Sequence, residues 1–163
     1  MTVDYHKAPY FSDPDTGFEL KPLDPKHDNT AATILAEATG ENTPEAAQAV
    51  MDRTRNAGAD RVIGGWLNDE LIGAYTIERD GMANQVTTLA VTSDHRRKGF
   101  GKTMLLDALR RSGRRPLTAE TDEESLGFYK ACGFKMVGRR KHPSGVFRYR
   151  VGWHAPRNEA ENC

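Results

Sequence analysis

The sequence predicts a single mixed α/β domain, in which about four helices flank a mostly antiparallel central sheet of about seven strands. Three observations support this fold class. Strand-like segments joined by short turns come early in the chain and predict antiparallel pairing. A strand, a basic loop and a helix then lead to another strand, which predicts a parallel crossover. A further helix precedes a final hairpin, and 163 residues suffice for one buried core.

The domain is expected to cover residues 18–153. Residues 1–17 are polar, contain two prolines and end in a turn, so we expect a mobile N-terminal arm there. Residues 154–163 are expected to form a C-terminal tail. No repeat and no low-complexity segment interrupts the chain.

Hydrophobic periodicity and turn signals place the elements in order. Strands are predicted at 18–23, 61–67, 71–78, 85–91, 116–120, 134–137 and 146–153. Helices are predicted at 30–38, at 43–57, from the basic loop to Ser112, and at 122–132. Thr43 and Pro44 have the types expected of an N-cap and a first helical residue. Thr121 to Glu124 fits a capping box, and Gly133 fits the position after a helix end.

The basic loop at 96–101 has the composition of an anion-binding loop. It leads into a helix, whose first amides lack partners within the helix and carry partial positive charge. Gly99 and Gly101 allow the backbone to approach an anion closely. Four side chains add positive charge: Arg96, Arg97, Lys98 and Lys102. We interpret the loop as a diphosphate site; the alternative is a basic helix cap without a ligand.

Spacing separates this loop from other phosphate-binding loops. A Walker-type loop requires glycine where Arg96 stands, and a dinucleotide fingerprint requires glycine where Met104 stands. The pattern that remains is Arg96-x-x-Gly99-x-Gly101, after a strand that ends in Leu89-Ala90-Val91. This pattern resembles the acetyl-coenzyme A loop of the GNAT family of N-acetyltransferases.

A second segment, Asp122 to Phe134, is similar to a later motif of the same family, N-x-x-A-x-x-[LF]-Y-x-x-x-G-F. The matching residues are Phe128, Tyr129, Gly133 and Phe134, whereas Asp122 and Ser125 stand where the family usually has Asn and often has Ala. With the order of the elements, the two motifs extend the resemblance over nearly all of residues 18–153.

The resemblance implies a sheet that splays between its fourth and fifth strands, with acetyl-coenzyme A as cosubstrate in the gap. The cofactor's pantetheine arm would pair with the end of the fourth strand, and loop amides would hold its diphosphate. The cofactor-binding residues implied are Leu89, Ala90, Val91, Arg96, Arg97, Lys98, Gly99, Phe100, Gly101, Lys102 and Tyr129.

The family's reaction moves an acetyl group to a primary amine by direct attack on the thioester. Tyr129 occupies the position of the family's usual general acid. A phenol stays protonated at neutral pH and can donate a proton toward the sulfur. The alternative is a core aromatic side chain. Glu120 is the preferred candidate base, Asp122 and Glu78 are weaker candidates, and a water chain is the alternative to a dedicated base. Cys132 is interpreted as a core residue.

Composition excludes several classes of protein. The chain has 23 basic and 23 acidic residues, so no net charge favours nucleic acid or an anionic membrane. No segment is long and apolar enough for a membrane span or a signal peptide, which predicts a cytoplasmic protein. Two cysteines are too few for a disulfide framework or a zinc site, and no metal is expected.

These observations lead to one preferred function and one main rival. The preferred reading is an acetyl-coenzyme A-dependent N-acetyltransferase whose acceptor is a small-molecule amine or a protein amine. The rival is a non-catalytic module of the same fold that binds coenzyme A or an acyl-coenzyme A. The sequence contains no motif that identifies the acceptor. It also does not specify the oligomeric state, and a homodimer is one possibility.

Overall fold

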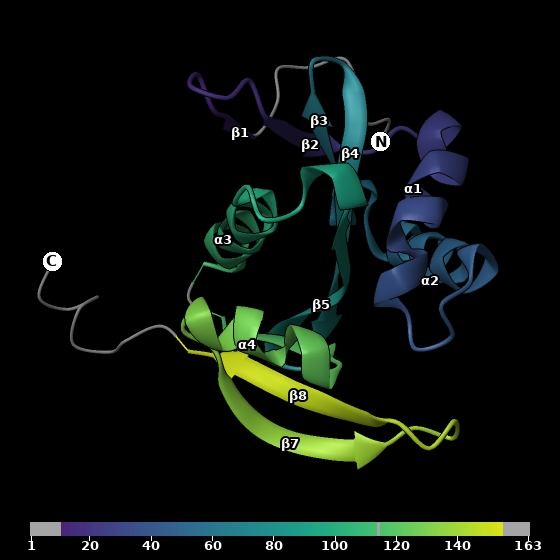
Figure 1. Cartoon of the computed structure of the whole chain (residues 1–163), viewed down its shortest axis with the longest axis vertical. Coiled ribbons are helices and arrows are strands. Elements are labelled where there is room, and N and C mark those ends of the chain that lie inside the picture. Colours follow the sequence, from purple (N-terminus) through teal and green to yellow (C-terminus); the bar gives the residue numbers. More distant parts are fainter. Residues whose placement is uncertain (1–10, 114, 155–163) are drawn as a thin grey trace, which may run out of the picture. The chain divides into compact units, whose positions relative to one another are not determined.

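The structure, a computed structural model, describes residues 11–113 and 115–154 (Figure 1). Within them the chain forms two compact units, one made of 11–78 and 87–107 and the other of 79–86 and the described residues after 107. Residues 1–10 of the predicted arm and 155–163 of the predicted tail lie outside the described residues. We describe each unit separately.

The elements occur in the predicted order. The strands are β1 (Phe11–Ser12), β2 (Glu19–Pro22), β3 (Val62–Leu67), β4 (Glu70–Asp80), β5 (Ala83–Val91), β6 (Leu117–Thr121), β7 (Lys135–Lys141) and β8 (Phe147–Trp153). The helices are α1 (Asp28–Leu35), α2 (Pro44–Ala57), α3 (Phe100–Ser112) and α4 (Glu123–Ala131). Within the described residues, four 3-10 turns lie between them: η1 (Pro25–His27), η2 (Ala36–Ala38), η3 (Ala59–Arg61) and η4 (Ser93–His95).

The described strands form one sheet in the order β1-β2-β3-β4-β5-β6-β8-β7. The sheet is mostly antiparallel, and β5 pairs with β6 in parallel, with Asn84 opposite Leu117 and Val86 opposite Ala119. The mixed α/β fold class, the four helices and the parallel crossover are therefore confirmed. The splay expected further along these two strands stays a prediction.

In the first unit, α1 and α2 pack against each other and cover one side of β3 and β4, while α3 lies on the other side (Figure 1). Leu35 of α1 and Met51 of α2 are fully buried, in a cluster that includes Ala74 of β4. Burial of each of these two large side chains stabilises the fold by about 1.5–3 kcal/mol. On the opposite side of β4, the Cβ position of Gly73 lies 3.3 Å from Met104 of α3, so glycine allows this helix to approach closely.

In the second unit, α4 packs against β8 and β7, which form a hairpin (Figure 1). Gly133 ends α4 in the left-handed conformation (φ 93°), as its sequence position predicts, and the Phe134 amide donates to the Tyr129 carbonyl at 3.0 Å. The N-cap of α4 is Asp122, one residue later than the predicted capping box, because its Oδ1 accepts from the Ser125 amide at 2.7 Å.

Three local features complete the description. The Thr43 hydroxyl accepts from the Ala46 amide at 3.1 Å, which confirms the predicted start of α2. Part of the predicted mobile arm, Phe11–Ser12, forms β1 against β2, a pairing too short to show as periodicity. No helix of the described residues is long and apolar enough to cross a membrane.

Candidate functional site

The predicted anion-binding loop lies between β5 and α3, and its residues belong to the first unit. Two of its residues have left-handed backbone conformations, Arg97 with φ 63° and Gly99 with φ 86°. Such a conformation is strained for a non-glycine residue and is often found at ligand-binding loops. The Thr103 amide makes the first helical bond of α3, to the Gly99 carbonyl at 3.0 Å. The amides of the preceding α3 residues therefore lie at the free end of the helix, where they can bind an anion.

Arg96 fixes the start of this loop. Its Nε donates to the Val91 carbonyl at the end of β5, at 3.0 Å, and its Nη2 pairs with the Glu37 carboxylate. Glu37 belongs to η2, which connects α1 to α2. The motif arginine thus joins the loop to the strand end and to the α1–α2 connection. Its predicted contact with a diphosphate stays a prediction.

The other cationic side chains of the loop are accessible to a ligand. Arg97, Lys98 and Lys102 are exposed, and among the described residues none of them pairs with a carboxylate. Phe100 differs from them, because its ring is buried and packs against Phe18 with the ring centroids 4.6 Å apart. Of the Phe100 atoms, only those of the backbone are therefore suited to a cofactor. Exposed cations around free amides fit a diphosphate.

The residues predicted to pair with the cofactor's pantetheine arm form the end of β5. Ala90 and Val91 are buried, and Leu89 is half-buried. Directly after Val91, the Thr92 amide donates to the carbonyl of Ile72 on β4 at 2.7 Å. This bond fixes the direction in which the chain leaves β5 and enters the loop.

Tyr129 lies in the second unit, on α4, and is only 6% exposed. Its ring makes edge-on contacts with Phe128 and Phe134, with centroid distances of 5.2 and 5.6 Å. Burial raises the pKa of the phenol to about 12, although the positive charge of Arg148 acts in the opposite direction. Tyr129 therefore stays protonated at neutral pH and can donate its proton or a hydrogen bond.

The carboxylates considered as bases all have partners. Glu120, at the end of β6, accepts from Arg140 Nη2 at 2.8 Å, and Glu78 accepts from Arg53 Nε at 2.7 Å. Asp122 caps α4, as described above. Tyr129 and Glu120 share the second unit, but no hydrogen bond joins their side chains in the part of the chain that is described.

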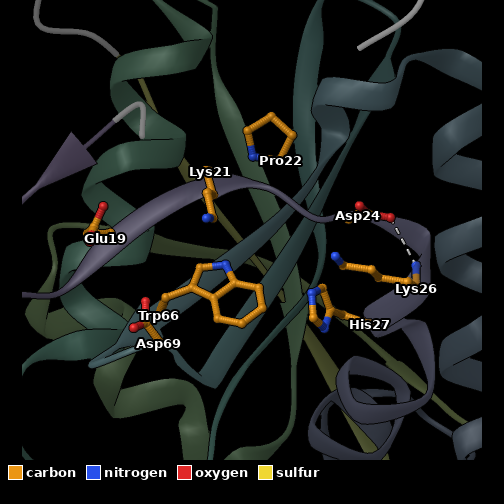
Figure 2. A pocket seen from close by; sticks show the side chains of 8 residues that line it. All are labelled: Glu19, Lys21, Pro22, Asp24, Lys26, His27, Trp66 and Asp69. Carbon is orange, nitrogen blue, oxygen red and sulfur yellow. Dashed lines mark hydrogen bonds between the residues drawn. The ribbon is translucent and has the colours of Figure 1, made fainter. Parts of the chain in front are cut away.

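The first unit also contains a pocket that the sequence did not indicate (Figure 2). It has a volume of about 240 Å³ and is lined by Glu19, Lys21, Pro22, Asp24, Lys26, His27, Trp66 and Asp69. A β-bulge between Gly65 and Trp66 directs the indole, whose ring has the Lys21 ammonium 5.3 Å from its centroid and the His27 ring edge-on at 4.8 Å. The pocket lining comes from β2, from η1 with the preceding Asp24, from β3 and from the turn between β3 and β4, and the first two of these segments are far from the last two in the sequence.

No group of three or more His, Cys, Asp or Glu side chains suited to a metal ion occurs in the described residues. Cys132 is half-buried at the end of α4 and forms no disulfide. The loop therefore offers backbone amides and cations, and the second unit offers the Tyr129 phenol and the Glu120 carboxylate.

Comparison with known proteins identifies related sequences and folds. Residues 28–148 match the family model for the acetyltransferase (GNAT) domain. A curated relative, "Uncharacterized N-acetyltransferase YvbK" from Bacillus subtilis (strain 168), is 31% identical over 80 residues, which are 44% of this chain and 50% of the relative. The chain thus matches about half the length of this relative.

Solved structures share the fold at low sequence identity. Ard1 from Thermoplasma volcanium aligns with a TM-score of 0.73 and 16% identity, over 85% of this chain and 98% of that one. An aminoglycoside 6'-N-acetyltransferase complexed with coenzyme A aligns with a TM-score of 0.70 and 14% identity, over 85% and 98% of the two chains. PaiA N-acetyltransferase from Thermoplasma acidophilum, in complex with coenzyme A, aligns with a TM-score of 0.60 and 16% identity, over 83% and 99%.

Proposed function

The chain belongs to the GNAT acetyltransferase family, and we propose that it is an N-acetyltransferase that moves an acetyl group from acetyl-coenzyme A to a primary amine. The observation that supports this most is the loop between β5 and α3 in a chain of this family. Its left-handed Arg97 and Gly99, the free amides of α3 and the exposed cations fit the diphosphate of coenzyme A.

In this proposal the chain's residues divide into a binding group and a reacting group. The amides from Arg97 to Lys102 hold the diphosphate, and Arg96 keeps the loop in place through Val91. The backbone of Leu89, Ala90 and Val91 pairs with the pantetheine arm. Bound acetyl-coenzyme A supplies a thioester carbonyl that is activated toward attack by an amine.

The reaction itself requires two proton movements. The amine nitrogen forms a bond to the carbonyl carbon, the bond from that carbon to sulfur breaks, and the amine loses a proton. We assign protonation of the departing thiolate to the Tyr129 hydroxyl, because Tyr129 occupies the position of the family's usual general acid and a phenol is protonated at neutral pH. Direct attack requires no covalent intermediate on the protein.

The proton acceptor is Glu120 in the preferred version of the proposal. Both of its carboxylate oxygens accept from Arg140, Oε1 at 2.8 Å and Oε2 at 3.5 Å, so it would take the amine proton through its remaining lone pairs or through a water. The side chain is 28% exposed, which leaves it accessible to water. The alternative is a chain of waters without a dedicated base.

A specific observation also supports a second candidate function. Glu120, Glu78 and Asp122 each form an ion pair or a helix cap, as expected if none of them acts as a base and the protein only binds its ligand. Such a module would bind coenzyme A or an acyl-coenzyme A and catalyse nothing.

One experiment separates the two candidates. Thiol release from acetyl-coenzyme A is followed with a panel of small amines and peptide amines, and calorimetry measures coenzyme A binding in parallel. Turnover above the background rate supports the enzyme, whereas binding without turnover supports the module. Absence of both would contradict the proposal. The cytoplasmic location expected from the sequence is part of the proposal and would be tested by cell fractionation.

A further inference from the structure

One face of the sheet in the second unit carries three arginines. The register places Arg148 of β8 directly opposite Arg140 of β7, and Arg150 of β8 directly opposite Glu120 of β6. Residues directly opposite each other share a face, and side chains alternate along a strand, so these four side chains project to the same side. The other side carries the fully buried Val151. We call the exposed side, with Arg140, Arg148, Arg150 and Glu120, the arginine face.

Two of the three arginines on this face have an acidic partner. Arg140 pairs with Glu120 at 2.8 Å, and Arg150 pairs with Asp80 at 3.2 Å. Arg148 has none: its Nη2 donates to the backbone carbonyl of Glu120 at 3.3 Å, and within the described ranges no carboxylate forms an ion pair with it. Arg148 is a half-buried residue whose guanidinium is held by a backbone carbonyl and not by an ion pair.

The charged neighbours of Arg148 along the register explain why its lack of an ion pair points to a ligand. Like charges directly opposite each other on adjacent strands are destabilising, and Arg148 is opposite Arg140. Asp122 follows β6 on the side of Arg148 along the register, but its carboxylate caps α4. Asp122 keeps its negative charge in this cap, but among the described residues it forms no ion pair with Arg148. Of the three arginines on the arginine face, Arg148 is therefore the one whose guanidinium can pair with the anion of a ligand.

We propose that Arg148 binds a carboxylate of the acceptor, so that the acceptors of this protein are small amines that also carry a carboxylate, such as amino acids. This inference rests on the proposed acetyltransferase function. A guanidinium presents N–H donors in a planar fork that matches the two oxygens of a carboxylate. With one nitrogen turned to the Glu120 carbonyl, Arg148 is oriented and its remaining donors are available to the ligand.

The location of Arg148 favours the acceptor over the cofactor as the source of the anion. Arg148 Nη2 donates to the backbone carbonyl of Glu120 at 3.3 Å, so the guanidinium lies beside the residue proposed to accept the amine proton. The side chain of Glu120 projects to the same face of the sheet as Arg148. In coenzyme A the pantetheine arm separates the thioester from the diphosphate, so an anion beside Glu120 belongs to the reacting end.

Matched pairs of amines test the proposal. Each pair consists of an amino acid and the amine formed by its decarboxylation: phenylalanine and phenethylamine, lysine and cadaverine, alanine and ethylamine. For the full chain we expect kcat/KM to be at least about tenfold higher for the amino acid of a productive pair, which is the effect of one good charged contact. Arg148→Gln should reduce this preference by raising KM for the amino acid, with a smaller loss of kcat/KM for the decarboxylated amine, because the charge of Arg148 also acts on the pKa of Tyr129.

Two further variants serve as controls. Arg148→Lys keeps the charge without the planar fork, and we expect it to retain part of the preference. Arg139→Gln removes the same charge from the same hairpin, on the opposite face, where Arg139 lies 4.7 Å from the centroid of the Phe147 ring. It should behave like the unmodified protein. Thermal unfolding of each variant verifies that the fold is intact.

Several outcomes would overturn the proposal. These are an equal loss for both members of each pair in Arg148→Gln, no preference in the unmodified protein, or a loss of coenzyme A affinity in Arg148→Gln. If no amine is turned over, the enzymatic proposal fails by itself. The carboxylate site is then tested by calorimetry of N-acetylphenylalanine against N-acetylphenethylamine on the protein saturated with coenzyme A. Binding of the first alone, lost in Arg148→Gln, supports the site, and absence of that binding overturns it.

Discussion

The Nε of Arg96 donates to the backbone carbonyl of Val91 at 3.0 Å, so the motif arginine connects the start of the loop to the end of β5. Its Nη2 reaches the carboxylate of Glu37, whose side chain is 68% exposed. The bond to Val91 shapes the loop backbone, whereas the exposed ion pair with Glu37 is open to water and screened by salt.

We therefore predict different results for the two partners of Arg96. Arg96→Ala should weaken coenzyme A binding by about tenfold, because a hydrogen bond to a charged group that orders the loop is lost. Glu37→Ala should change affinity and stability little, since exposed ion pairs contribute about 0–1 kcal/mol. Calorimetry with coenzyme A and thermal unfolding measure both effects. Equal losses of affinity in the two variants would contradict this role for the Arg96–Val91 bond.

A second prediction concerns the loop backbone. If several amides share the charge of the diphosphate, Gly101→Leu should reduce coenzyme A affinity by about tenfold or more, because the new side chain obstructs access to them. Lys98→Ala removes one exposed cation and should cost about two- to threefold. Circular dichroism verifies that both variants are folded before calorimetry. Equal losses, or the reverse order, would show that side-chain charge dominates and that the backbone does not.

The sequence predicted the helices and most strands because their signals are local. Thr43 and Pro44 begin α2 through a side-chain cap, and Gly133 ends α4 through its left-handed conformation. Such signals need only neighbouring residues. β1 was not predicted, because two residues carry no periodicity and only the pairing with β2 reveals them as a strand.

The candidate site combines local and long-range features. The loop at 96–101 and Tyr129 are candidates from motif spacing, which is a local property. The partner of Glu120 was not, because Arg140 lies on a different strand and meets it only through the pairing of β6, β8 and β7. Trp66 and its pocket were missed for the same reason. Contacts between distant segments depend on register, which one sequence does not specify.

Burial of Tyr129 predicts a dependence of stability on alkaline pH. Its pKa is raised from 10.0 to about 12 in the folded chain, so between these values the folded state binds one more proton than the unfolded state. Its contribution is complete below pH 10 and is lost as the pH rises toward 12, by roughly 3 kcal/mol in total. Tyr129→Phe lacks this loss. Urea unfolding of both proteins from pH 8 to 11 measures the difference, and parallel curves would contradict the burial effect.

Tyr129→Phe also tests the proposed general acid. The hydroxyl is expected to act mainly in the transition state, so kcat should fall by about a hundredfold or more while coenzyme A affinity stays nearly unchanged. Phenylalanine preserves the edge-on contacts with Phe128 and Phe134. Thiol-release kinetics and calorimetry give the two quantities. An undiminished kcat would remove Tyr129 from the mechanism and favour protonation of the thiolate by solvent.

The last prediction separates a base from a structural carboxylate at position 120. If Glu120 accepts the amine proton, directly or through one water, Glu120→Gln should flatten or shift the acidic limb of the pH–rate profile. Arg140→Gln is the matched control, because it breaks the same ion pair and leaves the carboxylate in place. It should keep the acidic limb, although the limb's midpoint can move. If the two variants lower thermal stability to the same extent and leave the shape of the profile unchanged, Glu120 only pairs with Arg140, and the amine proton leaves through water.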